Sequence, residues 1–377
     1  MPLFLAITSR GLLEPLEKEI ESLQVKRVKR KPDGVEFEGS WADLYRVHLH
    51  SRLATRILMP VSNFIAYNQE DLYHGVFKKH DFTKYITPKQ TLRVEAHVRE
   101  HKNLTDQRFV AMKVKDALCD QFKKKYDERP DVGDEDSADL RVVVRIVSQQ
   151  VSVALDLTGE SLSYRGYRQF IGEAPLREHV AEGLLKLAGW APPVPLIDPF
   201  CGSGTILIEA ALDAHGYIAT HRRRKFAFEN LLGFQDEVYR GLVNQQERKP
   251  PPSKPFLFGY DKDAQIIEKA RSNARAAGVE NWIHFQHRDI AELKAPNVEP
   301  GMIITNPPYG ERLEDTERAS RLFETFAKTL KTEFKGWNAW ILNGNPEAIK
   351  GLRLKAKLKI PVWNAQIDCR LLNYPIT

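Results

Sequence analysis

The chain has 377 residues, of which 56 are Lys or Arg and 50 are Asp or Glu, so its net charge at neutral pH is +6. This length is more than one hydrophobic core usually supports and predicts two or three domains, while the basic balance is compatible with a nucleic-acid partner. Three scattered cysteines without metal-ligand spacing, and an apolar start too short for a signal or a membrane span, lead us to expect a cytoplasmic protein that uses neither a metal nor a membrane.

Residues 1–52 predict a small β-α-β-β-α unit. Apolar alternation indicates one strand at 3–7 and two strands within 25–37, joined at a Lys-Pro-Asp-Gly turn. Helical patterns cover residues 12–23 and 40–50, and the second helix begins with a typical capping residue. This order corresponds to about half of a ferredoxin-like arrangement.

A second compact region is expected at residues 53–157. It contains one predicted helix, over 105–126, and four predicted strands, near 56–65, 92–97, 140–147 and 151–157. The helix turns Lys123, Lys124 and Lys125 away from its apolar face. These lysines either form a solvated face or bind RNA phosphates.

From residue 158 onward the chain alternates between strand and helix patterns. Strands are predicted at 196–198, 256–260, 283–287, 302–305 and 339–342, and helices at 206–214, 266–277 and 322–330. Such alternation is typical of an α/β domain with a mostly parallel, doubly wound sheet. We therefore expect a Rossmann-like domain over residues 158–377.

A glycine-rich turn follows the first strand of this domain. Gly202 and Gly204 allow a tight turn and a close approach to a ligand, and the next helix would present free N–H groups. The same turn could also join a strand to a helix without any ligand. It lacks the G-x-G-x-x-G spacing of dinucleotide sites, and Asp198 suits a cofactor with an ammonium group better than one with phosphates.

Carboxylates also follow the next two strands. Asp261 could bind two ribose hydroxyls, with Asp263 as a competitor for that role, and Asp289 could accept a hydrogen bond from an adenine amine. Asp198 and Asp261 are much further apart than the about 20 residues of a plain β-α-β unit, so a segment is inserted between them. It contains a basic run that is either a solvated cluster or a phosphate-binding surface: Arg222, Arg223, Arg224 and Lys225.

The strongest catalytic signal is Asn306-Pro307-Pro308-Tyr309, which follows an apolar strand. Prolines cannot donate to a sheet, so carbonyl groups remain to accept hydrogen bonds at the strand end. The Asn306 amide oxygen and the Pro307 carbonyl could accept both protons of an NH2 group, and Tyr309 could stack on the ring that carries it. A turn that only ends the strand would explain one proline, not the whole set.

Together, segments 198–205 and 306–309 resemble the amino-methyltransferases, whose signature combines a D-P-F/P-x-G-S-G-T loop with N-P-P-Y. The resemblance implies a class I methyltransferase domain that uses S-adenosylmethionine. It also implies two sets of site residues. The cofactor-binding set is Asp198, Phe200, Gly202, Ser203, Gly204, Thr205, Asp261, Asp289 and Ile290, and the catalytic set is Asn306, Pro307, Pro308 and Tyr309.

Segments 155–168 and 174–178, with shorter ones on either side, look like the THUMP-containing rRNA methyltransferases. That resemblance implies a ferredoxin-like region at 1–52, a THUMP RNA-binding domain at 53–157 and the catalytic domain at 158–377. It implies an RNA partner, most specifically large-subunit rRNA methylated at guanine N2, and adds Arg165 and Arg168 to the RNA contacts. Ser163-Tyr164 departs from the pattern, because basic residues are usual there.

Three other functions are compatible with parts of the sequence. An adenine-N6 methyltransferase on DNA or RNA would share the Asn306–Tyr309 motif, and the RNA-binding resemblance argues against the DNA enzyme. A non-catalytic RNA-binding adaptor is disfavoured by the complete motif. A nucleotide-dependent oxidoreductase is disfavoured by the missing phosphate-binding fingerprint.

Overall fold

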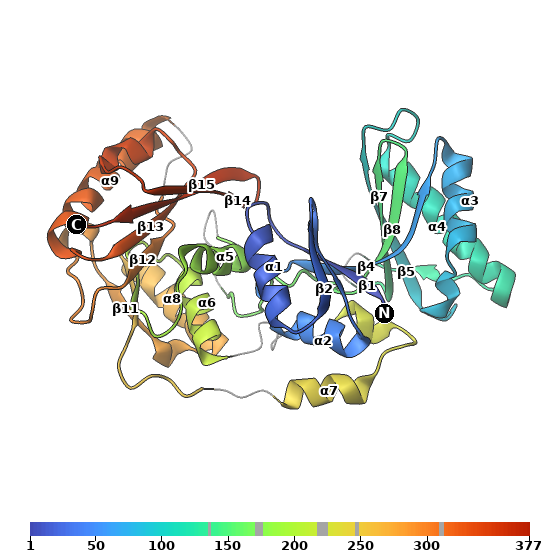
Figure 1. The fold of residues 1–377 in the computed structure, drawn as a ribbon, viewed down its shortest axis with the longest axis horizontal. Coiled ribbons are helices and arrows are strands. Elements are labelled where there is room, and N and C mark those ends of the chain that lie inside the picture. The colour runs from blue at the N-terminus through green and yellow to red at the C-terminus, as the bar shows by residue number, and fades with distance from the viewer. Residues whose placement is uncertain (135–136, 170–175, 217–224, 246–248, 309–312) are drawn as a thin grey trace.

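The computed structural model describes residues 1–134, 137–169, 176–216, 225–245, 249–308 and 313–377. Two bodies follow one another along the long axis of the molecule (Figure 1). The N-terminal body is built on an eight-stranded sheet and the C-terminal body on a seven-stranded sheet. The two ends of the chain lie in different bodies.

The N-terminal body begins with the expected elements and extends them by one strand. They are β1 (Leu3–Ile7), α1 (Leu13–Ser22), β2 (Lys26–Lys31), β3 (Gly34–Glu38), α2 (Trp41–His50) and β4 (Arg56–Ile65). Ser40 caps α2 as predicted, because its hydroxyl accepts from the Asp43 N–H at 3.2 Å and its own N–H donates to the Asp43 carboxylate at 2.8 Å. The sequence predicted only half of a ferredoxin-like unit. Strand β4 completes the β-α-β-β-α-β order, so the whole unit is present.

Strand β4 also joins the first unit to the second. Its start pairs with β1, and from Leu58 onward it pairs antiparallel with β8 (Gln150–Asp156). The register shifts between Pro60 and Ser62, where a proline without an N–H suits a break in the ladder. The expected boundary after residue 52 thus lies just before a strand that belongs to both units.

The rest of the second unit contains all the predicted elements. They are accompanied by further ones: α3 (Gln69–Lys79), η1 (Phe82–Lys84), β5 (Thr91–Arg99), α4 (Gln107–Tyr126), β6 (Asp131–Val132) and β7 (Leu140–Val147), where η marks a 3-10 helix. Helix α3 packs beside α4 (Figure 1). It was not predicted because it fully buries only Leu72 and Val76, too few positions for a clear apolar period.

The C-terminal body confirms the predicted α/β alternation. Its sheet has the order β11-β10-β9-β12-β13-β15-β14, in which the first five strands are parallel and β15 is antiparallel to both of its neighbours. The strands are β9 (Leu196–Asp198), β10 (Leu257–Asp261), β11 (Ile283–His287), β12 (Met302–Thr305), β13 (Asn338–Asn343), β14 (Leu358–Asn364) and β15 (Ile367–Pro375).

Helices cover both faces of this sheet, so it is doubly wound. One buried cluster lies between the sheet and α5 (Glu178–Ala188), α6 (Thr205–His215) and α8 (Ala264–Ala277). A second cluster lies between the opposite face and α9 (Leu313–Glu333). Short 3-10 helices complete the body: η3 (Glu280–Trp282), η4 (Ile290–Glu292) and η5 (Ala348–Leu352). Helix α5, the 3-10 helices and the antiparallel pair β14–β15 at one edge were not predicted.

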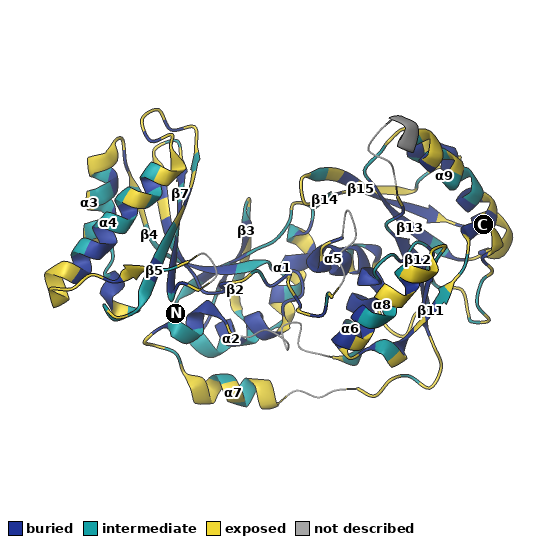
Figure 2. Cartoon of the chain, turned by 180° about the vertical axis from the view of Figure 1, so that it is seen from behind, coloured by how far each residue is buried: buried dark blue, intermediate teal, exposed yellow. Residues whose placement is uncertain are grey.

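The segment inserted between α6 and β10 returns to the N-terminal body. This inserted segment, residues 225–245, contains η2 (Ala227–Asn230) and α7 (Asp236–Asn244). Phe226 and Phe228 lie within the N-terminal core, and the Gln235 N–H donates to the Tyr45 hydroxyl at 3.1 Å. Helix α7 itself is largely exposed (Figure 2). Part of the predicted 158–377 domain therefore packs with the first domain.

A buried ionic cluster also joins the two bodies. The Glu209 carboxylate on α6 accepts from the Arg165 Nε at 3.5 Å and lies 3.9 Å from the Arg52 guanidinium. The Tyr167 hydroxyl donates to the same carboxylate at 3.0 Å. Arg52 follows α2, so the N-terminal body is attached to the helix that begins at the glycine-rich turn. Over the ranges described, no helix has both the length and the apolar character needed to cross a bilayer.

Candidate active site

Polar side chains from neighbouring strands meet at the C-terminal edge of the parallel sheet. Asp198 ends β9, Asp261 ends β10 and Asn306 follows β12. The strands are adjacent in the order β10-β9-β12, which brings these residues to one edge although they are far apart in sequence. The chain reverses its winding between β9 and β12, and ligands of doubly wound sheets bind at such switch points.

The glycine-rich turn at this edge has a backbone that its glycines require. Gly202 has φ +52° and Gly204 has φ +83°, both in the left-handed region. A Cβ at Gly204 would lie 3.0 Å from the Phe285 ring, so packing also demands glycine there. A Cβ at Gly202 would meet no described atom within 4 Å. Gly202 thus faces open space, where a ligand can approach the backbone.

Asp198 is a buried carboxylate with few compensating partners. It is 2 % exposed, and its Oδ1 accepts from the Thr305 hydroxyl at 2.6 Å and from the Phe200 N–H at 3.2 Å. Burial raises the pKa of Asp198 to about 7, and the nearby Asp261 carboxylate acts in the same direction. A cation would stabilise the ionised form, which agrees with the predicted contact to an ammonium group.

Asp261 and Asp263 have different surroundings. Asp261 accepts from the Gly202 N–H at 3.2 Å and from the Asp263 N–H at 3.0 Å, and burial raises its pKa. Asp263 instead caps α8, because its Oδ1 accepts from the Gln265 N–H at 2.8 Å. The geometry therefore favours Asp261 over its competitor for the ribose hydroxyls.

The remaining residues of the predicted cofactor set line the same edge. The Ser203 and Thr205 hydroxyls are 3.3 Å apart, and the Phe200 ring packs edge-on against Phe326 with centroids 5.1 Å apart. Asp289 is exposed and caps η4 through the Ala291 N–H at 2.8 Å. Ile290 differs, because its side chain is buried in the core beneath the sheet.

Asn306 carries a buried acceptor that the described residues leave without a hydrogen-bond partner. That atom is Oδ1 of its side-chain amide. An unsatisfied buried acceptor costs about 1–3 kcal/mol, so a donor from a bound ligand would be favourable here. Pro307 is buried and Pro308 is exposed, whereas Tyr309 lies outside the described residues.

The predicted RNA contacts are divided between distant places. Lys123, Lys124 and Lys125 are exposed at the end of α4, at the far side of the N-terminal body (Figure 1). Lys225 is exposed and donates to the Asn230 side chain. Arg222, Arg223 and Arg224 lie outside the described residues.

Two other predicted RNA contacts, Arg165 and Arg168, have partners within the protein. Arg165 is 3 % exposed and its guanidinium binds Glu209 and the main-chain carbonyl of Arg52, so the structure does not present it on the surface as the predicted RNA contact requires. Arg168 is half-buried and donates to the Glu178 carboxylate at 3.2 Å and to the Thr205 hydroxyl at 3.2 Å. It therefore supports the start of α6 beside the glycine-rich turn.

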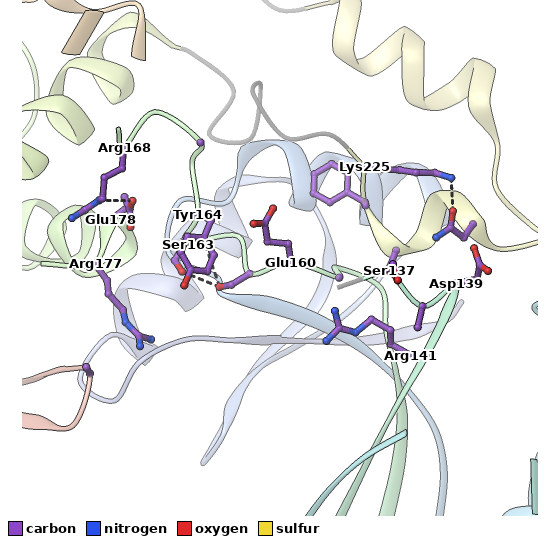
Figure 3. Close-up of a pocket in the computed structure, with 18 of the residues that line it drawn as sticks. Ser137, Asp139, Arg141, Glu160, Ser163, Tyr164, Arg168, Arg177, Glu178 and Lys225 are labelled. Atoms are coloured by element: carbon purple, nitrogen blue, oxygen red, sulfur yellow. Dashed lines mark hydrogen bonds and ion pairs between the residues drawn. The ribbon is translucent and has the colours of Figure 1, made fainter. Parts of the chain in front are cut away.

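A large cavity at the junction of the two bodies was not predicted (Figure 3). This junction cavity has a volume of about 1100 Å³ and lies between β7, the linker that follows β8, the start of α5 and the inserted segment. Its lining includes Arg141, Tyr164, Arg168 and Arg177. These residues come from separate parts of the sequence, and no local pattern connects them.

Comparisons with known proteins agree with this architecture. The profile of the UPF0020 family, described as an RMKL-like methyltransferase domain, matches residues 165–373. An RlmL ferredoxin-like domain matches residues 3–58, and a THUMP domain matches residues 66–156.

Three solved structures resemble the whole chain, and each is 27 % identical to it. One is described as a possible methylase from Clostridium difficile 630, with a TM-score of 0.89 over 100 % of this chain and 98 % of that one. Another is SMU.472, a methyltransferase complexed with SAH, with a TM-score of 0.88 over 100 % and 98 %. The third is described as a predicted N6-adenine-specific DNA methylase from Listeria monocytogenes, with a TM-score of 0.89 over 100 % and 96 %.

Proposed function

The chain belongs to the UPF0020 family of RMKL-like methyltransferase domains, and from this premise we propose that it methylates the exocyclic amine of a base in RNA, most specifically guanine N2 of large-subunit rRNA. The enzyme is an S-adenosylmethionine-dependent methyltransferase. Its THUMP domain provides the RNA-binding part. The observation that points to an amine as the methyl acceptor is the buried Asn306 amide oxygen, which has no hydrogen-bond partner among the described residues.

The residues at the sheet edge fit the cofactor. S-adenosylmethionine supplies an electrophilic methyl group when bound. We infer that Asp198 stabilises the ammonium group of the cofactor, because burial makes the ionised carboxylate costly in the absence of a cation. Asp261 would bind the ribose hydroxyls and Asp289 the adenine amine, while Gly202 leaves space for close approach of the ligand.

The chain's part in the reaction is to position and polarise the base amine. The lone pair of such an amine is delocalised into the ring, so the nitrogen must become tetrahedral and positive in order to react. Acceptors at the Asn306 amide oxygen and the Pro307 carbonyl would bind its two N–H groups, and these hydrogen bonds strengthen as the positive charge develops. Tyr309 would stack on the base after it has rotated out of the RNA. No strong general base is needed before methyl transfer.

RNA rather than DNA is favoured by the N-terminal body. Residues 3–58 form a ferredoxin-like unit and residues 66–156 a THUMP domain, on one continuous sheet. We infer that the exposed lysines at the end of α4, Lys123 to Lys125, contribute phosphate contacts at a distance from the reacting base. A ribosomal RNA substrate would place the enzyme in the cytoplasm.

The test is methyl transfer from isotope-labelled S-adenosylmethionine to unmodified large-subunit rRNA, with mass identification of the product nucleoside. We expect N2-methylguanosine in RNA treated with the wild-type enzyme, and much slower incorporation of label with Asn306→Ala. N6-methyladenosine as the product would show that the target base is adenine and not guanine. Label found only in DNA would show that the substrate is DNA and not RNA. Cofactor binding without transfer to any nucleic acid would support a non-catalytic adaptor.

A further inference from the structure

The junction cavity contains a buried arginine with spare hydrogen-bonding capacity. Arg141 on β7 is 6 % exposed, and its Nε lies 3.7 Å from the Asp156 carboxylate. Arg56 binds the same carboxylate oxygen, so two guanidinium groups share one carboxylate. The Nη1 of Arg141 has no hydrogen-bond partner among the described residues. One buried N–H donor of Arg141 next to the cavity is therefore left without a hydrogen-bond acceptor among the described residues.

A second arginine at the other end of the cavity has the same property (Figure 3). Arg168 donates to Glu178 and to the Leu176 carbonyl, but its Nη1 has no partner among the described residues. Leaving a buried charged donor without a partner costs more free energy than leaving a neutral donor unpaired. An anion bound to one or both of these guanidinium groups would offset that cost.

The cavity also offers an aromatic surface and enough room for more than an ion. Tyr164 lines it and is 63 % exposed, and Figure 3 shows it between the two arginines. Nucleic-acid bases stack on exposed aromatic rings without sequence preference. The volume of about 1100 Å³ is above the about 300–1,000 Å³ range of small-molecule sites, so it can hold part of a polymer.

The lining of the cavity also contains acidic residues, so its surface is not uniformly basic. Asp139 accepts from the Thr91 N–H and hydroxyl, both at 2.9 Å, and Glu178 is paired with Arg168. The charges are therefore mixed, because the lining also contains the exposed Glu160, Arg177 and Lys225. The Nη1 atoms of Arg141 and Arg168 are the buried donors of the lining that no described residue pairs. Arg168 also contacts Thr205, so the cavity wall continues directly into the glycine-rich turn.

We propose that the junction cavity binds the single-stranded RNA segment next to the reacting nucleotide, with a phosphate group on Arg141 and a base stacked on Tyr164. The proposal rests on the RNA substrate inferred above and names the place where the strand passes from the THUMP domain to the methyl donor. The exposed ring of Tyr164 provides the stacking surface for that strand.

The test is equilibrium binding of a labelled single-stranded RNA of about twelve nucleotides across a range of salt concentrations. Arg141→Gln should weaken binding about tenfold or more and make the salt dependence shallower by about 0.7 in log slope. Tyr164→Ala should weaken binding about 5- to 100-fold, and Tyr164→Phe should bind like the wild type. Arg275→Gln, which removes an exposed ion-paired arginine from α8, is the matched control.

Thermal unfolding followed by far-UV circular dichroism reports whether the N-terminal body of each variant is folded, and cofactor affinity, measured by calorimetry, reports the same for the C-terminal body. The proposal would be overturned if the Arg141→Gln and Tyr164→Ala variants bind cofactor normally and also keep the RNA affinity and salt dependence of the wild type. If Arg141→Gln does not fold, the comparison of Tyr164→Ala with Tyr164→Phe tests the proposal by itself. Both variants should fold, because the exposed Tyr164 ring makes little contribution to the core. Binding is measured without turnover, so absence of rRNA methylation by the wild type would count against the proposed function and not against this site.

Discussion

At the scale of single residues, Asn306 should act on the rate and not on binding. Asn306→Ala removes the acceptor whose hydrogen bond strengthens as the amine becomes positive, so kcat should fall by about two to three orders of magnitude. Asn306→Asp keeps oxygen acceptors at the site and should retain more activity than the alanine variant. Single-turnover kinetics at saturating cofactor and RNA measure this, together with the two affinities. A fully active Asn306→Ala enzyme would remove the amine-positioning role.

Asp198 should make cofactor affinity depend on pH. Its pKa of about 7 means that the carboxyl group must lose a proton to stabilise the cofactor ammonium, so affinity should fall about tenfold per pH unit below pH 7. Calorimetric titration of S-adenosylmethionine between pH 6 and pH 8, on the order of one measurement per half unit, resolves this slope. Asp198→Asn should bind weakly and lose the dependence. An equal slope in the variant would assign it to another group, such as Asp261.

The same pKa has the opposite consequence for stability without cofactor. A carboxyl group whose pKa is raised by folding contributes stability that is present below its unfolded pKa and is lost as pH rises to about 7. Asp198→Asn should therefore unfold at a higher temperature than the wild type at alkaline pH, and at a similar temperature in acid. At neutral and alkaline pH, Asp198 therefore lowers the free energy of unfolding of the cofactor-free protein, which is typical of a group that serves binding.

At the scale of elements, the inserted segment should stabilise the N-terminal body. Phe228 is buried against Tyr45 and His48, with ring centroids 4.8 Å and 4.9 Å away. Phe228→Ala should lower the free energy of unfolding by about 3–5 kcal/mol. Val238→Ala, on the exposed helix α7, should change it by less than about 0.5 kcal/mol. Urea unfolding followed by far-UV circular dichroism compares them, and equal stabilities would mean that the segment is not docked in solution.

At the scale of the whole molecule, the buried ionic cluster should couple the two bodies. Arg165→Ala leaves Glu209 with one fewer positive partner, which costs about 3–5 kcal/mol for a buried pair. We expect calorimetric unfolding to change from one transition to two, while Arg275→Gln retains the single transition. The variant should still bind cofactor but methylate RNA more slowly, because the RNA-binding body is no longer held against α6. A single transition in Arg165→Ala would show that other contacts maintain the coupling.

The sequence alone determined the features that local chemistry controls. Strand and helix periodicity predicted most strands and most helices. The turn at Gly202–Gly204 and the segment that begins at Asn306 predicted a candidate active site at one edge of the sheet, because backbone conformation and strand-end position are local properties. Tertiary structure decided what depends on partners distant in sequence. It assigned Asp263 to a helix cap and placed Arg165 beside Glu209, since the role of a charge depends on what lies around it once it is buried. It also made β4 common to two units and formed the junction cavity from five separate segments, which no stretch of sequence encodes alone.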